Sequence, residues 1–533
     1  MNNSLFKKII IVNVLVLVLF SLFIVLEVAP FFKEFTREKE KLTTRQIKQE
    51  INKEEKSEAV KEQETTKEIN KEDKKAEITV DYNDNLGEFS PYVFGTLSSP
   101  FVDKSGFFAA KEAGFKMIEI SMSVKMPSDP EDLSQYDFTK LDQQVSAAIE
   151  YGVEPMIWFS QNKTKPEDID GFSAFTKNIL KHLTKEENNG HNWNIKVLRF
   201  GNEPDNAAFW SGTKEDFFTY YSAWAKAAKS VDENFILIAP SLMIIKDNGN
   251  IASWATEFLK YNKDNDVPLD VFSFHAYSPF IYEDFYDDFK TIKSELKKYP
   301  TLSPIYGVPK LANDEWNIMV GDAWSGSYHN QFDTAWVAAQ NVMALIGMIE
   351  GGDLFLSVRY GGMFNDKKGG NFGGCHDFPL VDCDKKGKLA YYAMKAFNQF
   401  VGKTRILTKG SDFVNLGAIA GKSNKEIITI ISNFDIDKYI SEYPQPSKSP
   451  VSKQIDSYVS KFGNLKTYNE YKLELNNLPW GSSDELIYER YVVDEEKKLE
   501  LVETKILSGN STLSFIIEKV FAPSVQLIKV YKN

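Results

Sequence analysis

The stretch RFGNEPDNAAFW, residues 199–210, follows the short apolar run IKVL and places one glutamate between an asparagine and a proline. An apolar run of this length, bounded by glycine and proline, is typical of a buried strand. Glu203 therefore stands just past the end of a predicted strand. A carboxylate at such a place is either a catalytic group or a charge that stabilises the N-terminus of the following helix.

Seven other runs of the same kind alternate with amphipathic stretches such as residues 214–231 and 333–349, which predict helices. Eight strand–helix units over residues 78–402 predict a (β/α)8 barrel, the TIM-barrel form of the α/β class. The predicted strands lie in YVFGTLSS (92–99), GFKMIEISMSV (114–124), GVEPMIWFS (152–160), IKVLRFGNEP (195–204), NFILIAPSL (234–242), LDVFSFHAYS (269–278), LANDEWNI (311–318) and GDLFLSVRYGG (352–362).

The pattern changes after Gly402. Residues 403–533 contain several strand-like runs separated by turns and no long amphipathic helix, which predicts a C-terminal β-sandwich. The run AEITVDYN, residues 76–83, can add a strand to this second domain.

The N-terminus predicts a membrane anchor. Lys7 and Lys8 precede an apolar run over residues 9–26, which is about the minimum length that spans a bilayer. We expect residues 1–32 to form an uncleaved single-pass transmembrane anchor with the catalytic domain outside the cytoplasm; the alternative is a cleaved signal peptide and a secreted protein. Residues 33–77 are highly charged and almost without apolar side chains, which predicts a disordered stalk.

Composition narrows the function classes. The 533 residues carry a formal net charge of −12, so a nucleic acid is not an expected partner. Cys375 and Cys383 are the two cysteines, and they form either one loop-closing disulfide or two free thiols. The five histidines show no metal-binding spacing and the glycine runs no nucleotide-binding context, so we expect neither a metal nor another cofactor.

Two glutamates follow barrel strands that are not neighbours. Glu203 follows the fourth predicted strand and Glu315 lies at the end of the seventh. Active sites of such barrels lie at the C-terminal ends of the strands. Two carboxylates facing each other there are the requirement for glycoside hydrolysis.

The motifs GNEP and DEWN at this spacing resemble the clan A glycoside hydrolases. ITVDYNDNLGEFSPYVFG and FSFHAYS look most similar to family 39, and DEWN looks similar to the nucleophile strand of family 51. The resemblance implies a retaining glycoside hydrolase with Glu203 as general acid/base and Glu315 as nucleophile. It also implies that Asn202 binds the sugar 2-hydroxyl.

Other residues are weaker candidates. His275 and Tyr277 end the sixth strand, where clan A enzymes place residues that orient the nucleophile and line the sugar site. Aromatic side chains favour the flat faces of sugars, so stacking is expected from Trp158, Trp316, Trp324 and Tyr360, with core packing as the alternative. Arg199 and Arg359 are candidates for subsite or nucleophile contacts.

Two departures from the clan pattern are visible. The second strand carries Glu119 where many members have an arginine, and the eighth strand ends in Arg359 and Tyr360 where many have a tryptophan.

Taken together, the sequence features predict a membrane-anchored retaining glycosidase acting on a cell-surface or exported polysaccharide or oligosaccharide. The alternatives are a carbohydrate-binding or polysaccharide-assembly protein on the same barrel and a transglycosylase.

Overall fold

The computed structural model describes residues 74–96, 104–247, 249–318, 332–363, 378–442, 458–462, 465 and 468–533. The predicted anchor and all of the predicted stalk before Lys74 lie outside these residues. Within the described ranges, every helix is too short or too polar to span a membrane.

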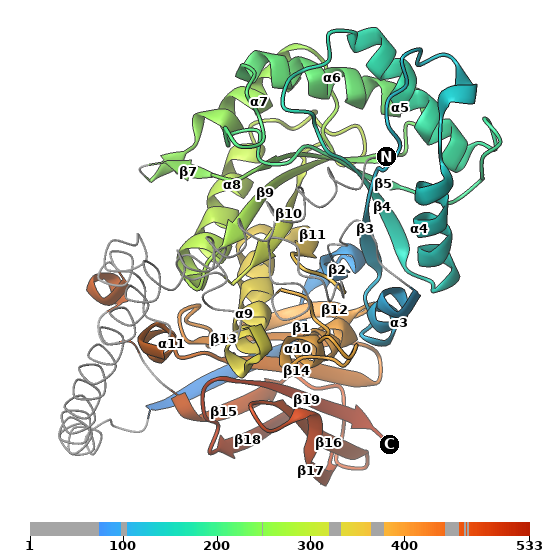
Figure 1. The fold of residues 1–533 in the computed structure, drawn as a ribbon. Coiled ribbons are helices and arrows are strands. Elements are labelled where there is room, and N and C mark those ends of the chain that lie inside the picture. Colours follow the sequence, from blue (N-terminus) through green and yellow to red (C-terminus); the bar gives the residue numbers. More distant parts are fainter. Residues whose placement is uncertain are drawn as a thin grey trace, which may run out of the picture. The chain divides into compact units, whose positions relative to one another are not determined.

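Eight parallel strands close a barrel around which the helices are arranged (Figure 1). Each of the eight predicted runs overlaps one of them, so the predicted TIM barrel is confirmed. In barrel order the strands are β2 (Gly95–Thr96), β3 (Met117–Ser121), β4 (Glu154–Phe159), β5 (Val197–Phe200), β6 (Ile236–Leu242), β9 (Val271–Tyr277), β10 (Lys310–Asn317) and β11 (Leu354–Arg359).

One helix follows each strand before the next strand begins. These helices are α3 (Lys104–Glu112), α4 (Thr139–Glu150), α5 (Ile169–Thr184), α6 (Lys214–Val231), α7 (Ser253–Asp264), α8 (Asp288–Leu296), α9 (Ala335–Gly352) and α10 (Leu389–Phe397). A short hairpin, β7 (Lys246–Asp247) with β8 (Asn250–Ile251), precedes α7, and a π-helical turn over Tyr282–Asp287 precedes α8. The start of α6 shows how the sequence fixes such a helix, because Thr213 and Asp216 form a reciprocal capping box.

The interior of the barrel is layered. Nine apolar side chains fill its lower part: Met117, Met156, Val197, Ile236, Ile238, Val271, Ala312, Leu356 and Val358. Side chains two residues further along a strand point to the same side. The positions after Met117, Met156 and Val197 therefore bring Glu119, Trp158 and Arg199 into the barrel above the apolar layer, on the side of the C-terminal strand ends.

The remaining strands form one nine-stranded sheet. In sheet order they are β17 (Lys498–Ser508), β16 (Glu485–Val493), β19 (Ser524–Lys532), β14 (Glu426–Asn433), β13 (Leu416–Lys422), β12 (Thr404–Lys409), β1 (Lys74–Glu88), β15 (Tyr468–Asn476) and β18 (Thr512–Glu518). A single apolar core contains side chains from strands near both ends of this order, so the sheet folds over on itself as a sandwich. A short helix, α11 (Ile436–Glu442), follows β14.

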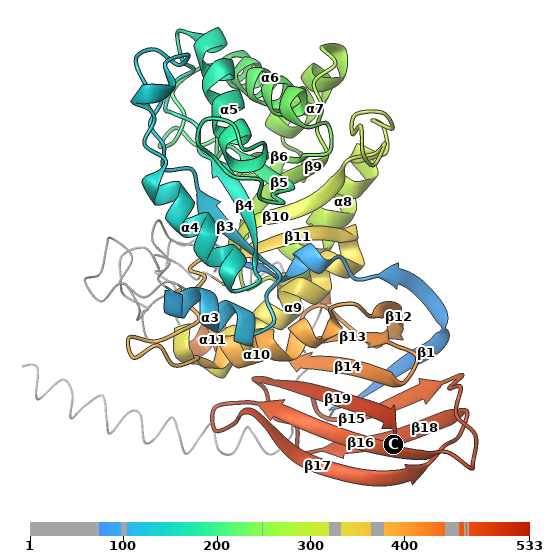
Figure 2. The same ribbon diagram turned by 90° about the vertical axis from the view of Figure 1, so that its right-hand side faces the viewer.

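Strand β1 belongs to this sheet and not to the barrel (Figure 2). It pairs antiparallel with β12 and parallel with β15. The strand begins at Lys74, whereas the sequence prediction places residues up to 77 in the stalk, so that boundary is wrong. The reason is the alternation of Ala76, Ile78 and Val80, whose side chains are all buried in the sheet core.

Helix α9 joins the two domains. Its side chains are almost all buried because the helix covers β11 of the barrel with one face and the sheet with another. The Ser432 hydroxyl of β14 donates to the Ala339 carbonyl at 2.7 Å. A helix as predominantly apolar as α9 is expected where both faces are covered.

Candidate active site

The loop after β5 is held in an uncommon backbone conformation. Gly201 has φ +99°, and a Cβ there would lie 2.8 Å from the Pro240 carbonyl oxygen. Glu203 itself has φ +45°, and its N–H donates to the Ser241 carbonyl at 2.8 Å. Strained non-glycine conformations of this kind gather at functional sites. The sequence GNEP thus turns the chain sharply off the strand and fixes Glu203 against β6.

Two side chains from the end of β4 fasten the same loop. The Trp158 indole N–H donates to the Gly201 carbonyl at 2.9 Å, and the Gln161 amide donates to the Asn202 carbonyl at 2.6 Å. The guanidinium carbon of Arg199 lies 4.8 Å from the centre of the Trp158 ring. Trp158 is half-buried and positions the loop; its contact with a sugar stays a prediction.

The Glu203 carboxylate has two side-chain partners. His275 Nδ1 lies 3.0 Å from Oε1, and the Asn206 amide donates to Oε2 at 2.9 Å. Burial alone raises the pKa of Glu203, but the hydrogen bond and charge of His275 and the hydrogen bond of Asn206 outweigh it, so the pKa is lowered.

His275 lies between Glu203 and Arg199 and contacts both of them. With Nδ1–H directed at Glu203, the neutral ring accepts at Nε2 from Arg199 Nη2, 3.2 Å away. His275 Nε2 also lies 3.7 Å from Asp314 Oδ1, the acceptor that a second proton, on Nε2, would face. Burial lowers the pKa of His275, but the surrounding carboxylates, Glu315 above all, raise it overall.

Glu315 faces Glu203 across the barrel mouth. The Tyr277 hydroxyl donates to Glu315 Oε1 at 2.6 Å. One carboxylate oxygen of Glu203, one of Glu315 and a ring nitrogen of His275 all lie within 4.8 Å of one another. The structure therefore brings together four residues from three places: Glu203 from the loop after β5, His275 and Tyr277 from β9, and Glu315 from β10.

A buried ionic layer lies next to these groups. Arg199 Nη1 donates to Glu119 Oε2 at 2.6 Å, and Arg199 Nε lies 2.7 Å from Asp314 Oδ2. All three side chains are fully buried. Burial raises the pKa of Glu119 to about 7 although the Arg199 charge opposes that shift, since Asp314 and Glu315 add to the negative charge nearby. The second strand thus supplies a carboxylate, and the arginine comes from the fourth strand.

Trp316 corrects one sequence expectation. It is fully buried, and its ring lies 6.3 Å from that of Phe285. Neighbouring side chains on a strand point to opposite faces, so a residue next to Glu315 points out of the barrel. The prediction that Trp316 stacks on a sugar is therefore wrong.

The other candidates take different positions. Tyr360 is half-buried, with its ring 6.0 Å from that of Tyr277, and Asn202 Oδ1 lies 3.5 Å from Arg199 Nη2; their substrate contacts stay predictions. Arg359 donates to Asn341 Oδ1 at 2.5 Å and to the Phe378 carbonyl at 2.6 Å, so it joins β11 to α9. Burial lowers the pKa of Arg359 to about 9.

Two predictions fall on residues that the structure does not describe. Trp324 lies outside the described residues, as does Cys375. Cys383 is described and takes part in a disulfide.

Sequence reasoning missed Asp314, Ser241, Gln161 and Asn206. Asp314 had a signal, because an acidic residue in an otherwise buried strand needs a partner. The Ser241 hydroxyl donates to Asp314 Oδ2, which adds a second bond to that carboxylate.

The buried layer gives a prediction about stability. The pKa of Glu119 rises from an ordinary value of 4.5 to about 7 on folding, so its stabilising contribution is full below pH 4.5 and is lost as pH rises to about 7. Glu119→Gln resembles the protonated form at every pH. We expect its free energy of unfolding to match the parent near pH 4.5 and to exceed it by up to roughly 3 kcal/mol at neutral pH. Thermal unfolding across this range measures the difference, with exposed Glu233→Gln as control; a difference that shrinks with rising pH would contradict the assignment.

Comparison with known proteins places the chain in a family. The family model of glycosyl hydrolases family 39 matches residues 108–443. The chain is 24% identical over 235 residues to a beta-xylosidase of Geobacillus stearothermophilus, covering 37% of this chain and 45% of the relative. It is 26% identical over 191 residues to a beta-xylosidase of Caldicellulosiruptor saccharolyticus, covering 31% and 37%.

These alignments span less than half the length of either relative. The fold is similar to a glucosidase from Croceicoccus marinus, with a TM-score of 0.67 at 19% identity over 86% of this chain and 99% of that one. Because the family model covers more than half of the chain, this protein belongs to glycosyl hydrolases family 39.

Proposed function

We propose that this protein is a retaining glycoside hydrolase in which Glu203 is the general acid/base and Glu315 is the nucleophile. The observation that carries the proposal is the approach of the two carboxylates, whose nearest oxygens lie within 4.8 Å. Retaining enzymes hold their carboxyl groups roughly 5–5.5 Å apart, whereas inverting enzymes leave room for a water between them.

In the first step, a Glu315 oxygen attacks the anomeric carbon and forms a glycosyl ester, while Glu203 gives its proton to the departing oxygen. In the second step, Glu203 takes a proton from water, and the hydroxyl attacks the same carbon and releases Glu315. Tyr277 holds one Glu315 oxygen through its hydroxyl, which leaves the other oxygen to attack. Both named relatives are beta-xylosidases, which supports a β-xyloside or related β-glycoside as substrate.

The main argument for a carbohydrate-binding or polysaccharide-assembly protein without catalytic turnover is weakened. That argument was the absence of an arginine from the second strand. Arg199 of the fourth strand lies in the barrel interior, 3.2 Å from His275 and 2.7 Å from Asp314, the residue before Glu315. A positive charge is therefore present beside the proposed nucleophile.

The location of the enzyme is a second part of the proposal. Residues 1–32 support a membrane anchor, and the charged residues that follow support a stalk outside the cytoplasm. A cell-surface or exported polysaccharide, or an oligosaccharide cut from one, is then the accessible substrate.

Substitution of each glutamate separates the two roles. We expect Glu203→Ala to lower kcat by about 10²–10⁴-fold on β-xylosides and Glu315→Ala to lower it at least as much. With azide added, Glu203→Ala should give a glycosyl azide of retained configuration, since azide attacks the glycosyl ester. Glu315→Ala should give the inverted azide, since azide replaces the missing nucleophile.

Aryl glycosides and xylo-oligosaccharides are the substrates for this measurement, and exposed Glu233→Gln is the activity control. Full activity in either alanine variant would reject the assignment. Sugar transfer to a glycoside acceptor in place of water would favour the transglycosylase alternative. Glycan binding without turnover in the parent would favour the binding protein.

The Glu203 environment gives a pH prediction. Burial raises the pKa of Glu203, whereas His275 and Asn206 lower it, and the lowering by His275 is the larger of the two. Glu203 must be protonated to act as the acid, so His275→Ala and Asn206→Ala should both move the basic limb of the kcat/KM profile to higher pH. The shift should be larger for His275→Ala. A basic limb that stays in place in both variants would contradict the role of Glu203.

Cell fractionation tests the location. We expect the full-length chain to sediment with membranes. Protease should digest it when added to cells whose cytoplasmic membrane is intact and whose outer layers let the protease through. Deletion of residues 1–32 should abolish membrane association. A shortened, active chain in the medium would favour the secreted alternative.

A further inference from the structure

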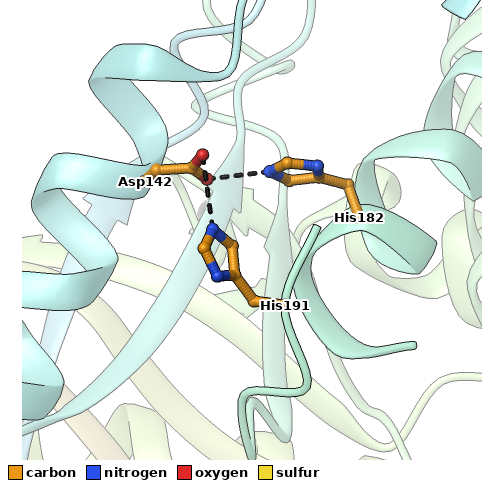
Figure 3. Close-up of side chains that lie close together, drawn as sticks. All are labelled: Asp142, His182 and His191. Atoms are coloured by element: carbon orange, nitrogen blue, oxygen red, sulfur yellow. Dashed lines mark hydrogen bonds and ion pairs between the residues drawn. The ribbon is translucent and has the colours of Figure 1, made fainter. Parts of the chain in front are cut away.

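Three metal-ligating side chains meet outside the barrel. Asp142 lies in α4, His182 in α5 and His191 in the loop after α5, and their side chains converge (Figure 3). Asp142 Oδ1 lies 2.9 Å from His182 Nε2, and Oδ2 lies 3.4 Å from His191 Nε2. The chosen donor atoms of all three residues lie within 4.8 Å of one another. The group is remote from the mouth in topology, because this loop leads into the N-terminal end of β5.

The orientation of His182 suits a metal ligand. Its Nδ1 lies 3.1 Å from the Asn188 carbonyl oxygen, which only accepts, so Nδ1 carries the proton. In the neutral ring, the Nε2 lone pair then faces a carboxylate oxygen 2.9 Å away. A metal-bound histidine commonly donates its second ring N–H to a backbone carbonyl, as His182 does.

The loop that carries His191 is built for this position. Asn188 and Asn189 have φ values of +57° and +54°, a region that asparagine tolerates better than most residues. A Cβ on Gly190 would lie 2.0 Å from the His182 carbonyl oxygen, so this position requires glycine. The His191 N–H donates to that same carbonyl at 2.6 Å. The sequence ENNGH thus fixes His191 beside His182.

Aromatic rings hold both imidazoles in place. The Phe138 ring stacks on His182 at 3.5 Å, and the Trp193 ring stacks on His191 at 3.7 Å. The side chain of His182 is 3% exposed, whereas those of Asp142 and His191 are 28% and 37% exposed. One ligand is therefore buried and rigid, and solvent reaches the other two.

We propose that Asp142, His182 and His191 bind a divalent transition metal of the zinc type. Two imidazoles and one carboxylate suit zinc, which completes a tetrahedron with water. Ligands about 2.0–2.1 Å from one zinc ion lie roughly 3.3 Å apart, close to the two distances at Asp142. The ion would join α4 to α5 and the loop before β5. Sequence spacing conceals the site, because Asp142 and His182 are 40 residues apart.

Zinc titration of the full-length chain, purified without a histidine tag and stripped with a chelator, tests the proposal. We expect one equivalent of Zn²⁺ to bind by calorimetry, and the unfolding temperature to rise by a few degrees at about 100 times the Kd. Co²⁺ in place of Zn²⁺ should give the visible absorption of a four-coordinate site. His191→Ala and Asp142→Asn should each weaken binding by about 100-fold or more.

His275→Ala is the matched control, because it removes the only other group of this kind among the described residues, Glu203, His275 and Glu315. Binding should persist in that variant. Zn²⁺ should leave the unfolding temperature of His191→Ala nearly unchanged, whatever the loss of the Trp193 stacking contact does to the metal-free value. Absence of a bound equivalent in the parent, binding that survives both substitutions, or binding lost only in His275→Ala would each overturn the proposal.

Discussion

The buried Arg199 guanidinium is the interaction on which the barrel mouth depends. It contacts carboxylates from β3 and β10 and the imidazole from β9, and it lies over the Trp158 ring of β4. A buried charge is costly unless it is paired and hydrogen-bonded. The side chains of five strands must therefore keep their relative positions for the charge to remain satisfied.

This constraint extends to the catalytic candidates. His275 spans the distance between Arg199 below and Glu203 above, and Asp314 precedes Glu315 in the chain. Arg199 faces three carboxylates, so one cation serves several negative charges. The raised pKa of Glu119 reflects that surplus. The buried ionic layer thus holds His275 and the Asp314–Glu315 segment in position, and its charges shift the pKa values of the groups at the barrel mouth.

The fold was largely predictable because most barrel strands are short apolar runs with a turn signal behind them. The places of the two glutamates in the barrel were also predictable, since Glu203 follows a buried apolar run and Glu315 lies near the end of another strand; their catalytic roles stay proposals. Trp316 was predicted wrongly because its place beside Glu315 in the sequence was taken as nearness to the sugar, although neighbours on a strand face opposite ways. The contacts of Arg199 could not be predicted, because they join residues that lie 80 positions apart for Glu119 and 115 (314 − 199) for Asp314. The Asp142, His182 and His191 cluster was hidden for the same reason.

A β-bulge in β10 explains how two adjacent acids serve different partners. Asn313 pairs with Phe274 and Glu315 with His275, so Asp314 is an extra residue opposite β9. In a regular strand, Asp314 and Glu315 would point to opposite faces. The extra residue lets Asp314 reach Arg199 while Glu315 reaches Tyr277, both on the inner side. Bulges commonly re-aim side chains near active sites, and this one gives the guanidinium its own carboxylate. Glu315 therefore does not have to neutralise Arg199 by direct contact, and its carboxylate stays directed at the mouth.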